Sequence, residues 1–308
     1  MQNSMTRRAF FRQAGMVGAG VLLTSAALVA YDSSTAAFTA VSAGTSGTLE
    51  RARKAGYIRV GFANEAPYAY ADENGHLTGE APTVAGVIMR ELGVPQLEGV
   101  LTEFGALIPG LQAQRFDMIA AGMFITPPRC QQILFSNPDY VGTEAFAVKA
   151  GNPHHLTDYR SAARSRVVIG AESGAIESTW LRESGVASSR IQLFPNGPTG
   201  MQALASGRID AFTLTAVSLE YLIKTGGYSG LKVTNPFVPV IHGHRALAAG
   251  GYGFRKSDAS LVQLFNNKLA ALQHSGHLPN LVARFGFRGA TVTAAYHLRA
   301  QQICKGSA

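Results

Sequence analysis

The feature that most constrains the fold is an alternation between two kinds of segment from residue 48 onward. Short runs rich in β-branched and aromatic residues alternate with longer stretches in which apolar residues recur every three to four positions. Such alternation is typical of α/β proteins, in which helices connect the strands of a mostly parallel sheet. We expect strands at 57–62, 116–120, 146–148, 167–170, 191–194, 211–214 and 250–254, and helices at 82–92, 108–114, 175–183, 199–206, 261–274 and 278–285.

The alternation is interrupted by a turn-rich segment at residues 149–153, which contains glycine, asparagine and proline. Beyond this segment the alternation of strand-like and helix-like segments begins again, and the sequence shows no repeat of fixed period. A length of 308 residues suits about two domains of roughly 150 residues each. The sequence therefore predicts two similar α/β lobes, with one boundary at this segment and a second crossing at residues 243–251.

Residues 1–43 are typical of an export signal followed by a flexible lead-in. Arg7 and Arg8 precede an uncharged run at 16–30, and these fifteen residues are fewer than the roughly 20 that span a bilayer as a helix. The arginine pair resembles the twin-arginine signal of bacterial export. We therefore expect a periplasmic protein; the alternative is a buried N-terminal helix with a chance arginine pair.

Cys130 and Cys304 are the only cysteines. Neither follows the uncharged run directly, so we expect no lipid anchor on a cysteine at the mature N-terminus. A disulfide between the two is permitted in an oxidising compartment, and two free thiols are the alternative. Two lone cysteines are a poor zinc site.

Charge and motifs exclude several function classes. The net charge of +8 falls to +6 without residues 1–43, and the basic residues form no run, which disfavours nucleic-acid binding. The sequence has no phosphate-binding P-loop, no nucleophile elbow and no zinc-protease motif. The histidines are scattered in loop-like sequence, so we expect no metal site.

Four loops after expected strands concentrate side chains that can hold a small ligand, and α/β folds place ligands at such loops. Three of them, all in the first lobe, carry Glu65, Tyr68, Phe104, Phe124 and Arg129. The fourth, at 171–177, opens a helix whose free backbone N–H groups suit an anion. Each residue alone is more often a packing residue or a solvent-exposed charge than a ligand contact. Their grouping favours a binding site.

Short motifs in this chain resemble those of periplasmic solute-binding proteins that serve ABC importers of polar amino acids. They lie at residues 58–62, 77–80, 110–111 ahead of 116–117, 125–126 ahead of 129, 135–136 and 207–211. The segments 61–70, 104–109 and 173–177 resemble the ectoine- and hydroxyectoine-binding members. The resemblance covers residues 49–306.

This resemblance implies the type II periplasmic binding protein fold, with two doubly wound α/β lobes joined by two crossover strands that close on the ligand like a hinge. Lobe 1 would hold residues 48–148 and 250–308, and lobe 2 residues 149–249. The expected ligand is a small zwitterion, ectoine or hydroxyectoine, and the expected partner is an ABC permease. The resemblance further implies a monomer without cofactor or catalytic residues.

The resemblance also assigns the loop residues. In the ectoine binders a carboxylate and three aromatic rings enclose the delocalised cation, which places Glu65 with Tyr68, Phe104 and Phe124 around it. Arg129 takes the ligand carboxylate, for which its guanidinium has a two-pronged geometry that lysine lacks. The expected ligand-binding set is completed by Ser173, Gly174, Ala175, Glu177 and Asp210.

Three alternatives remain at this stage. A polar amino acid would need a carboxylate for its compact ammonium group; Asp210 could supply it or could be structural. An enzyme similar to cyclohexadienyl dehydratase would need an acid and a base in the cleft, and Glu65 has no evident partner. The third alternative is an extracellular sensor module.

Overall fold

The computed structural model describes residues 47–306, so the expected export signal lies outside the described residues. The chain begins with a mixed sheet of strand order β4-β1-β5-β15-β6, with β7 also paired to β15. Its strands are β1 (Tyr57–Phe62), β4 (Gln96–Leu101), β5 (Met118–Phe124), β6 (Leu134–Phe135), β7 (Tyr140–Val141) and β15 (Ala249–Phe254). β1 is parallel to β4 and β5, whereas β15 returns antiparallel from the far end of the chain. The parallel strands therefore all end at the edge where the predicted ligand loops begin.

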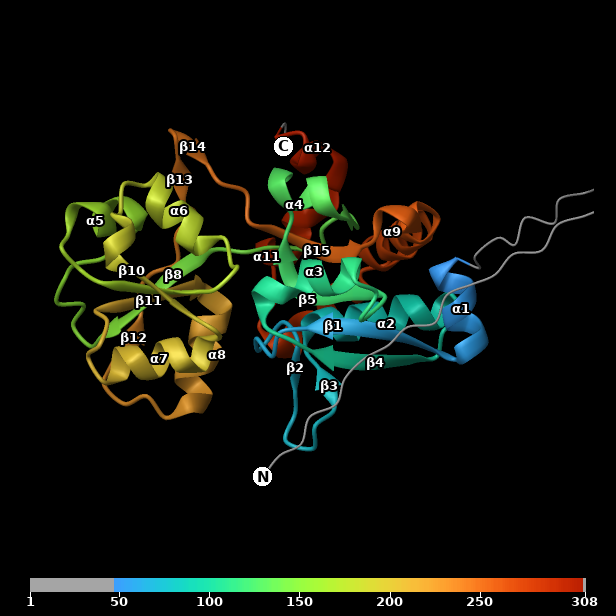
Figure 1. The fold of residues 1–308 in the computed structure, drawn as a ribbon, viewed down its shortest axis with the longest axis horizontal. Helices are drawn as coiled ribbons and strands as arrows, with labels where there is room; N and C mark the ends of the chain where they lie inside the picture. The colour runs from blue at the N-terminus through green and yellow to red at the C-terminus, as the bar shows by residue number, and fades with distance from the viewer. Residues whose placement is uncertain (1–46, 307–308) are drawn as a thin grey trace, which may run out of the picture. The chain divides into compact units, whose positions relative to one another are not determined.

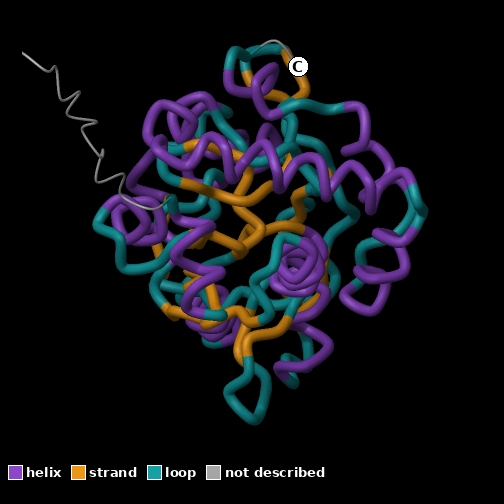
Figure 2. Tube along the Cα trace, turned by 90° about the vertical axis from the view of Figure 1, so that its right-hand side faces the viewer, coloured by secondary structure: helices purple, strands orange, loops and turns teal. Residues whose placement is uncertain are grey.

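Helices cover both faces of this first sheet, and Figure 2 shows the strands in the interior with helices around them. They are α1 (Thr48–Ala55), α2 (Glu80–Glu91), α3 (Leu107–Gln112), α9 (Ala259–His274) and α10 (His277–Val282). α2 buries Val84, Ala85, Ile88 and Met89, which recur at the three- to four-residue spacing of one helix face. No helix within residues 47–306 is long and apolar enough to cross a membrane.

The second sheet has strand order β10-β9-β11-β8-β12. Its strands are β8 (Glu144–Lys149), β9 (Ile169–Glu172), β10 (Ile191–Phe194), β11 (Ala211–Thr215) and β12 (Leu231–Val233), and its helices are α5 (Tyr159–Arg164), α6 (Glu177–Glu183), α7 (Gly197–Ala205) and α8 (Ala216–Gly226). Figure 1 shows the two sheets as separate groups of strands, each with its own helices. The predicted α/β fold with two sheet-containing lobes is confirmed.

The expected lobe boundary at Val148 is wrong. β8 pairs antiparallel with β11 and β12 of the second sheet, so residues 144–148 belong to the second lobe. The turn-rich segment that suggested a boundary instead joins two elements of that lobe. We call residues 47–141 with 249–306 lobe 1, and residues 144–245 lobe 2. The two crossings lie side by side, since the Gly142 amide donates to the Ala248 carbonyl oxygen at 2.7 Å.

Most expected elements lie within a few residues of those observed. β1 has the expected bounds, while α2 begins at Glu80 rather than at residue 82 and α6 begins at Glu177 rather than at residue 175. The expected helix 278–285 is α10 followed by a 3-10 turn, Ala283–Phe285. Helix ends are set by local hydrogen bonds that an apolar pattern does not report.

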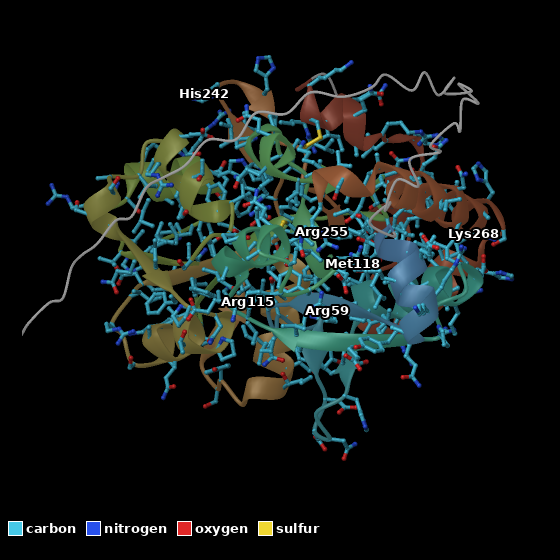
Figure 3. The ribbon with its side chains drawn as sticks, turned by 45° about the vertical axis from the view of Figure 1, so that its right-hand side comes forward. Arg59, Arg115, Met118, His242, Arg255 and Lys268 are labelled. Carbon is cyan, nitrogen blue, oxygen red and sulfur yellow. A yellow bond between two sulfur atoms is a disulfide. The ribbon has the colours of Figure 1, made fainter. Side chains whose placement is uncertain are left out.

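The start of β5 is held by ionic contacts at Asp117. Arg59 Nη2 lies 3.0 Å and Arg255 Nη2 3.3 Å from Asp117 Oδ1, which ties β1 and the end of β15 to the segment before β5. Figure 3 labels both arginines near Met118, the first residue of β5. The same strand ends at Phe124, so this network fixes the strand that leads into the ligand loops.

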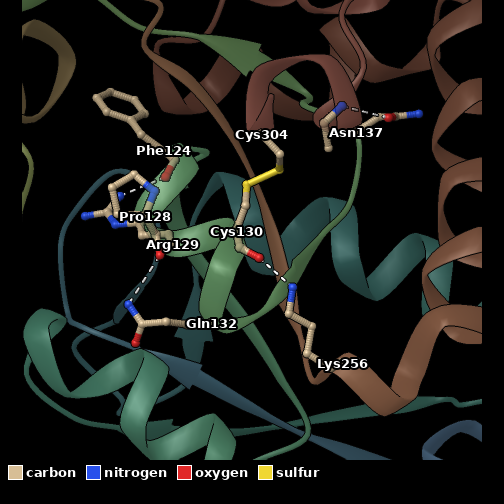
Figure 4. Close-up of a disulfide and its surroundings, with 9 residues drawn as sticks. Phe124, Pro128, Arg129, Cys130, Gln132, Asn137, Lys256 and Cys304 are labelled. Carbon is tan, nitrogen blue, oxygen red and sulfur yellow. Dashed lines mark hydrogen bonds between the residues drawn. A yellow bond between two sulfur atoms is a disulfide. The ribbon is translucent and has the colours of Figure 1, made fainter. Parts of the chain in front are cut away.

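A disulfide joins Cys130 in α4 (Pro127–Gln132) to Cys304 in α12 (Ala300–Cys304). The cysteines are 174 residues apart in sequence. Figure 4 shows the bridge beside Arg129 and Lys256. The C-terminal helix is thereby attached to the short helix that carries the predicted ligand-binding arginine.

Replacing both cysteines by serine should lower the free energy of unfolding by about 2–5 kcal/mol, because a long loop is no longer closed in the unfolded chain. Chemical denaturation of the parent and of Cys130→Ser/Cys304→Ser under oxidising conditions measures this. The parent in excess reductant is the matched control and should approach the variant. Equal stability of all three samples, or two titratable thiols in the oxidised parent, would contradict the bridge.

Candidate ligand site between the lobes

Two of the predicted residues connect the lobes directly. Ser218 Oγ, in the first turn of α8, donates to Glu65 Oε1 at 2.8 Å. Arg129 Nη2 donates to the Gly174 carbonyl oxygen at 3.0 Å. Glu65 and Arg129 belong to lobe 1, and Ser218 and Gly174 belong to lobe 2. The predicted carboxylate, Glu65, and the predicted arginine, Arg129, therefore both lie at the interface between the lobes.

Arg129 is held in place from several sides. Its Nη1 donates to the Phe124 carbonyl oxygen at 2.8 Å, and its guanidinium carbon lies 5.4 Å from the centre of the Phe104 ring. Burial lowers the pKa of this arginine, while the charge of Glu177 opposes that effect. A pocket of about 290 Å³ adjoins the guanidinium and is lined by Phe104, Gly105 and Gly174, among other residues.

The three predicted aromatic rings have different neighbours. Tyr68 packs against Tyr140 and Phe287 with centroid distances of 5.1 Å in both cases. Phe124 lies 6.1 Å from both Tyr140 and Trp180. Phe104 lies under Arg129 itself. The three rings are thus held by different neighbours, and their arrangement around a ligand cation stays a prediction.

Gly122 has a role in placing Tyr68. Its φ is +64°, and a Cβ atom there would lie 2.3 Å from Tyr68 Cδ1. Only glycine combines this backbone conformation with so close an approach. The Tyr68 ring can therefore lie flat against β5, which leaves its hydroxyl group buried near Thr215.

Glu65 and Glu177 form the acidic centre of the site. Burial, together with the negative charge of Glu177, raises the pKa of Glu65 to about 8, and the hydrogen bond from Ser218 acts in the opposite sense. Burial raises the pKa of Glu177 to about 7, against the effects of its own backbone N–H and of Arg129. At neutral pH Glu65 is therefore mostly protonated, whereas Glu177 is close to its midpoint.

Two further buried acids adjoin this centre, and neither is among the predicted site residues. Glu144 is the first residue of β8, and Glu172 is the last residue of β9. Burial raises the pKa of both, with Glu65 and Glu177 among the charges that add to the effect. The available signal in the sequence is a single acid next to an otherwise apolar strand run.

Several buried polar groups of this region have few hydrogen-bond partners among the described residues. Glu144 Oε1 has none, the Tyr68 and Thr215 hydroxyl groups interact with each other, and Glu172 and Glu177 interact with the backbone N–H groups of Gly197 and of Glu177 itself. A buried polar group without a partner costs about 1–3 kcal/mol, more if it is charged. Such atoms mark where a ligand can supply what the protein does not.

The loop 171–177 contains four of the predicted ligand-binding residues. Glu177 is the first residue of α6, and its side chain interacts with its own backbone N–H, so an acid already occupies the helix start where an anion was expected. Ser173 donates its backbone N–H to the Phe194 carbonyl oxygen at 2.8 Å. Gly174, with φ of +81°, meets Gly105 of lobe 1: a Cβ atom on Gly174 would lie 2.4 Å from Gly105 Cα. Ala175 packs against the apolar cluster that contains Phe104.

Asp210 lies outside the site. It precedes β11, at the opposite end of this strand from Thr215. Its Oδ2 accepts a hydrogen bond from the Val168 amide at 2.8 Å, and its Oδ1 lies 3.6 Å from His154 Nε2. Of the two roles left open for this acid, the structural one agrees with these contacts.

With this geometry in view, comparisons identify the class of protein. The sequence profile of the bacterial extracellular solute-binding proteins, family 3, matches residues 58–288. The chain belongs to this family, whose members are extracytoplasmic proteins that bind small amino-acid-like solutes and work with an ABC permease.

Particular relatives point the same way. A probable amino-acid ABC transporter periplasmic-binding protein from Sinorhizobium fredii is 32% identical over 260 residues, covering 83% of this chain and 86% of the relative. A solved structure of EhuB in complex with hydroxyectoine has 34% identity and a TM-score of 0.76, covering 83% of this chain and 97% of EhuB. An ancestral amino acid-binding protein, AncCDT-1, described as a precursor of cyclohexadienyl dehydratase, has 27% identity and a TM-score of 0.68, covering 78% and 99% of the two chains. The Sinorhizobium fredii relative and AncCDT-1 are both named as binding proteins.

The stability of the ligand-free protein should fall as pH rises from about 5 to 8. The pKa values of about 8 for Glu65 and about 7 for Glu177 exceed the ordinary value of 4.5, so the folded state retains protons that the unfolded chain releases in this range. Each group contributes at most about 1.4 kcal/mol per pH unit. Urea denaturation across this range measures the slope, which Glu65→Gln should flatten. The exposed Glu220→Gln is the control, and a Glu65→Gln profile parallel to that of the parent would contradict the assignment.

Closure of the lobes should depend on the small size of Gly105. A Cβ atom on Gly105 would lie 3.5 Å from Gly174 Cα, an ordinary contact, whereas the branches of valine extend further. We expect Gly105→Val to weaken ligand binding about tenfold or more while the unfolding midpoint of the ligand-free protein changes little, and Gly105→Ala to bind as the parent does. Equal affinity of all three proteins would show that these glycines do not meet in the liganded state.

Proposed function

We propose that this protein captures an ectoine-type zwitterion, ectoine or hydroxyectoine, for import by an ABC permease. The observation that carries the proposal is that Glu65 and Arg129, from one lobe, each form a hydrogen bond to the other lobe. A zwitterion has one group for each: a cation for the acid and a carboxylate for the arginine. A ligand held at both points would link the lobes and favour their closure.

The geometry of Arg129 suits the ligand carboxylate. Its guanidinium has five N–H donors, and the two hydrogen bonds that position it are to backbone carbonyl oxygens, so neither of them pairs it with a carboxylate. A ligand carboxylate would form a charge-assisted hydrogen bond with its other donors. The cation of the ligand would then face Glu65 and Glu177. Support for ectoine in particular comes from the 34% identity to EhuB, which was solved with hydroxyectoine.

A polar amino acid is the second candidate ligand. The acids Glu144 and Glu172 favour it, because four carboxyl groups suit a compact ammonium or guanidinium group at least as well as a ring cation. The relative from Sinorhizobium fredii, named as an amino-acid binding protein, agrees with this candidate. In either case we propose that the protein works as a monomer in the periplasm, after export directed by its twin-arginine segment.

Arg129→Lys should weaken ectoine binding by about 2–4 kcal/mol, since lysine keeps the charge but cannot hold the same paired contacts. Calorimetric titration with ectoine measures the loss, and Arg160→Lys, at an exposed position on α5, is the matched control. An ectoine analogue whose carboxylate is replaced by an uncharged carboxamide should bind the parent and Arg129→Lys with similar affinity. If the parent binds a polar amino acid more tightly than ectoine, the second candidate replaces the first. Binding of ectoine by Arg129→Lys within threefold of the parent would contradict the assignment of Arg129.

A further inference from the structure

The short helix that carries Arg129 has little packing of its own. α4 buries none of its six residues, whereas every other α-helix in the described part of the chain buries at least one. A cavity of about 310 Å³ adjoins Pro127 and Pro128, and the pocket of about 290 Å³ beside the guanidinium adjoins Gln132. Because a helix is normally fixed against a protein by burial of an apolar face, the position of α4 depends on contacts of another kind.

The disulfide attaches α4 to a helix that is packed against lobe 1. Cys304 is the last residue of α12, which buries Ala300 and Ile303. Both of these residues belong to the apolar cluster that contains Phe104. The Ala300 amide also donates to Asn137 Oδ1 at 3.2 Å, which connects α12 to the segment between β6 and β7. α12 is therefore fixed on lobe 1, and the disulfide fixes α4 in turn.

A lysine provides a second contact to α4. Lys256 Nζ donates to the Cys130 carbonyl oxygen, as Figure 4 shows. This carbonyl group lies near the end of α4, where backbone oxygens lack partners within the helix and attract positive charge. The residue before the lysine, Arg255, donates to the Phe116 carbonyl oxygen at 2.7 Å, and its Nη2 lies 3.3 Å from Asp117 Oδ1. Lys256 therefore extends from a backbone segment that is itself held in place.

Arg129 is the residue directly before the bridged cysteine. Its guanidinium donates to the carbonyl oxygens of Phe124, at 2.8 Å, and of Gly174 in lobe 2, at 3.0 Å. Hydrogen bonds weaken steeply as their distance and angle depart from the optimum, so a shift of α4 would disturb both contacts. A long side chain on a fixed backbone also loses less conformational freedom when it binds a ligand. Both effects make the affinity of Arg129 for a ligand depend on how firmly α4 is held.

We propose that the Cys130–Cys304 disulfide and Lys256 position Arg129 for the ligand carboxylate by holding α4, so that opening the disulfide weakens ligand binding as well as stability. This inference rests on the proposed function, in which Arg129 contacts the carboxylate, and adds a covalent support for that contact. Its physical basis is preorganisation: a charged group that is already fixed in the binding geometry costs less free energy to immobilise.

Calorimetry with two pairs of probes tests the proposal. Ectoine and L-arginine carry a carboxylate, and their carboxamide counterparts lack its charge. We expect Cys130→Ser/Cys304→Ser to bind the preferred carboxylate probe about tenfold more weakly than the parent, and the matching carboxamide within about threefold of the parent. In an Arg129→Lys background, loss of the disulfide should change carboxylate binding by less than about threefold, because the arginine contact is already absent. A merely structural role would weaken both probes of a pair equally and would add to the effect of Arg129→Lys.

Variants of Lys256 test the second contact. Lys256→Met should bind the preferred carboxylate probe about three- to tenfold more weakly, since the Cys130 carbonyl oxygen loses its charged donor. Lys256→Arg keeps a charged donor and should restore binding to within about twofold of the parent. Lys54→Met, at an exposed position on α1, is the matched control and should bind as the parent does. Equal affinity of Lys256→Met and the parent would remove Lys256 from the proposal.

Amide hydrogen exchange measures how firmly α4 is held without any ligand. The Ile133 amide donates to the Arg129 carbonyl oxygen at 3.0 Å at the end of this helix. A dithiol reductant converts the disulfide into two thiols and is itself oxidised to a cyclic disulfide. In the reduced parent the Ile133 amide should exchange at least about tenfold faster, whereas the Ala162 amide of α5, another six-residue helix, should keep its rate. The same reductant should leave Cys130→Ser/Cys304→Ser unchanged.

The possible results distinguish this inference from the proposed function. If the parent binds ectoine or L-arginine and the variant without the disulfide binds the same probe within about threefold, the positioning role is overturned and the proposed function stands. An Ile133 exchange rate that is equal in the bridged and reduced protein also overturns the positioning role. If the parent binds neither carboxylate probe, the proposed function fails, and the role of the disulfide in binding fails with it.

Discussion

The charge balance at the contact between the lobes governs the behaviour of this protein. The guanidinium of Arg129 feels the charge of Glu177, and Glu65, Glu144 and Glu172 are further buried acids of this region whose charges act on one another. Buried carboxyl groups so placed cannot all be ionised together. The ligand-free protein meets this constraint by keeping protons on its acids. A cationic ligand of the proposed kind would meet it in another way, by supplying positive charge and hydrogen-bond donors.

The fold places these charged groups near one another because the ends of strands from both sheets meet at the contact between the lobes. β1 and β5 lead into the loops of Glu65 and Arg129, and β9 and β11 lead into Glu172 and the start of α8. The crossings between the lobes are short and hydrogen-bonded to one another, as shown by Gly142 and Ala248. Two glycines, Gly105 and Gly174, let the backbones of the lobes meet. The charged side chains of the site thus lie at or after strand ends, and the two glycines allow the backbones of the lobes to come close together around them.

The sequence was informative where the signal is local. β1 was predicted with its observed bounds, and Glu65 and Arg129 were proposed as ligand contacts because each follows closely after an expected strand. The position of β8 was not predictable in this way, because a strand is assigned to a sheet by pairing with β11, more than sixty residues later. Glu144 and Glu172 escaped attention for a related reason: whether an acid next to a strand faces solvent or a buried site depends on the packing of both lobes. The packing of Tyr68 against Tyr140 and Phe287 also depends on distant segments, so it was not predictable from local sequence.

The central claim is that ligand charge replaces protons in this site, and proton exchange during binding tests it most directly. Ectoine is titrated into the protein at pH 7 in phosphate and in Tris, two buffers whose ionisation enthalpies differ. Because the pKa of Glu65 is about 8 before binding, a cation beside it should release roughly one proton or less per ligand, and the binding enthalpy should differ between the buffers in the sense of release. Ectoine binding with equal enthalpies in both buffers, or with proton uptake, would contradict the account.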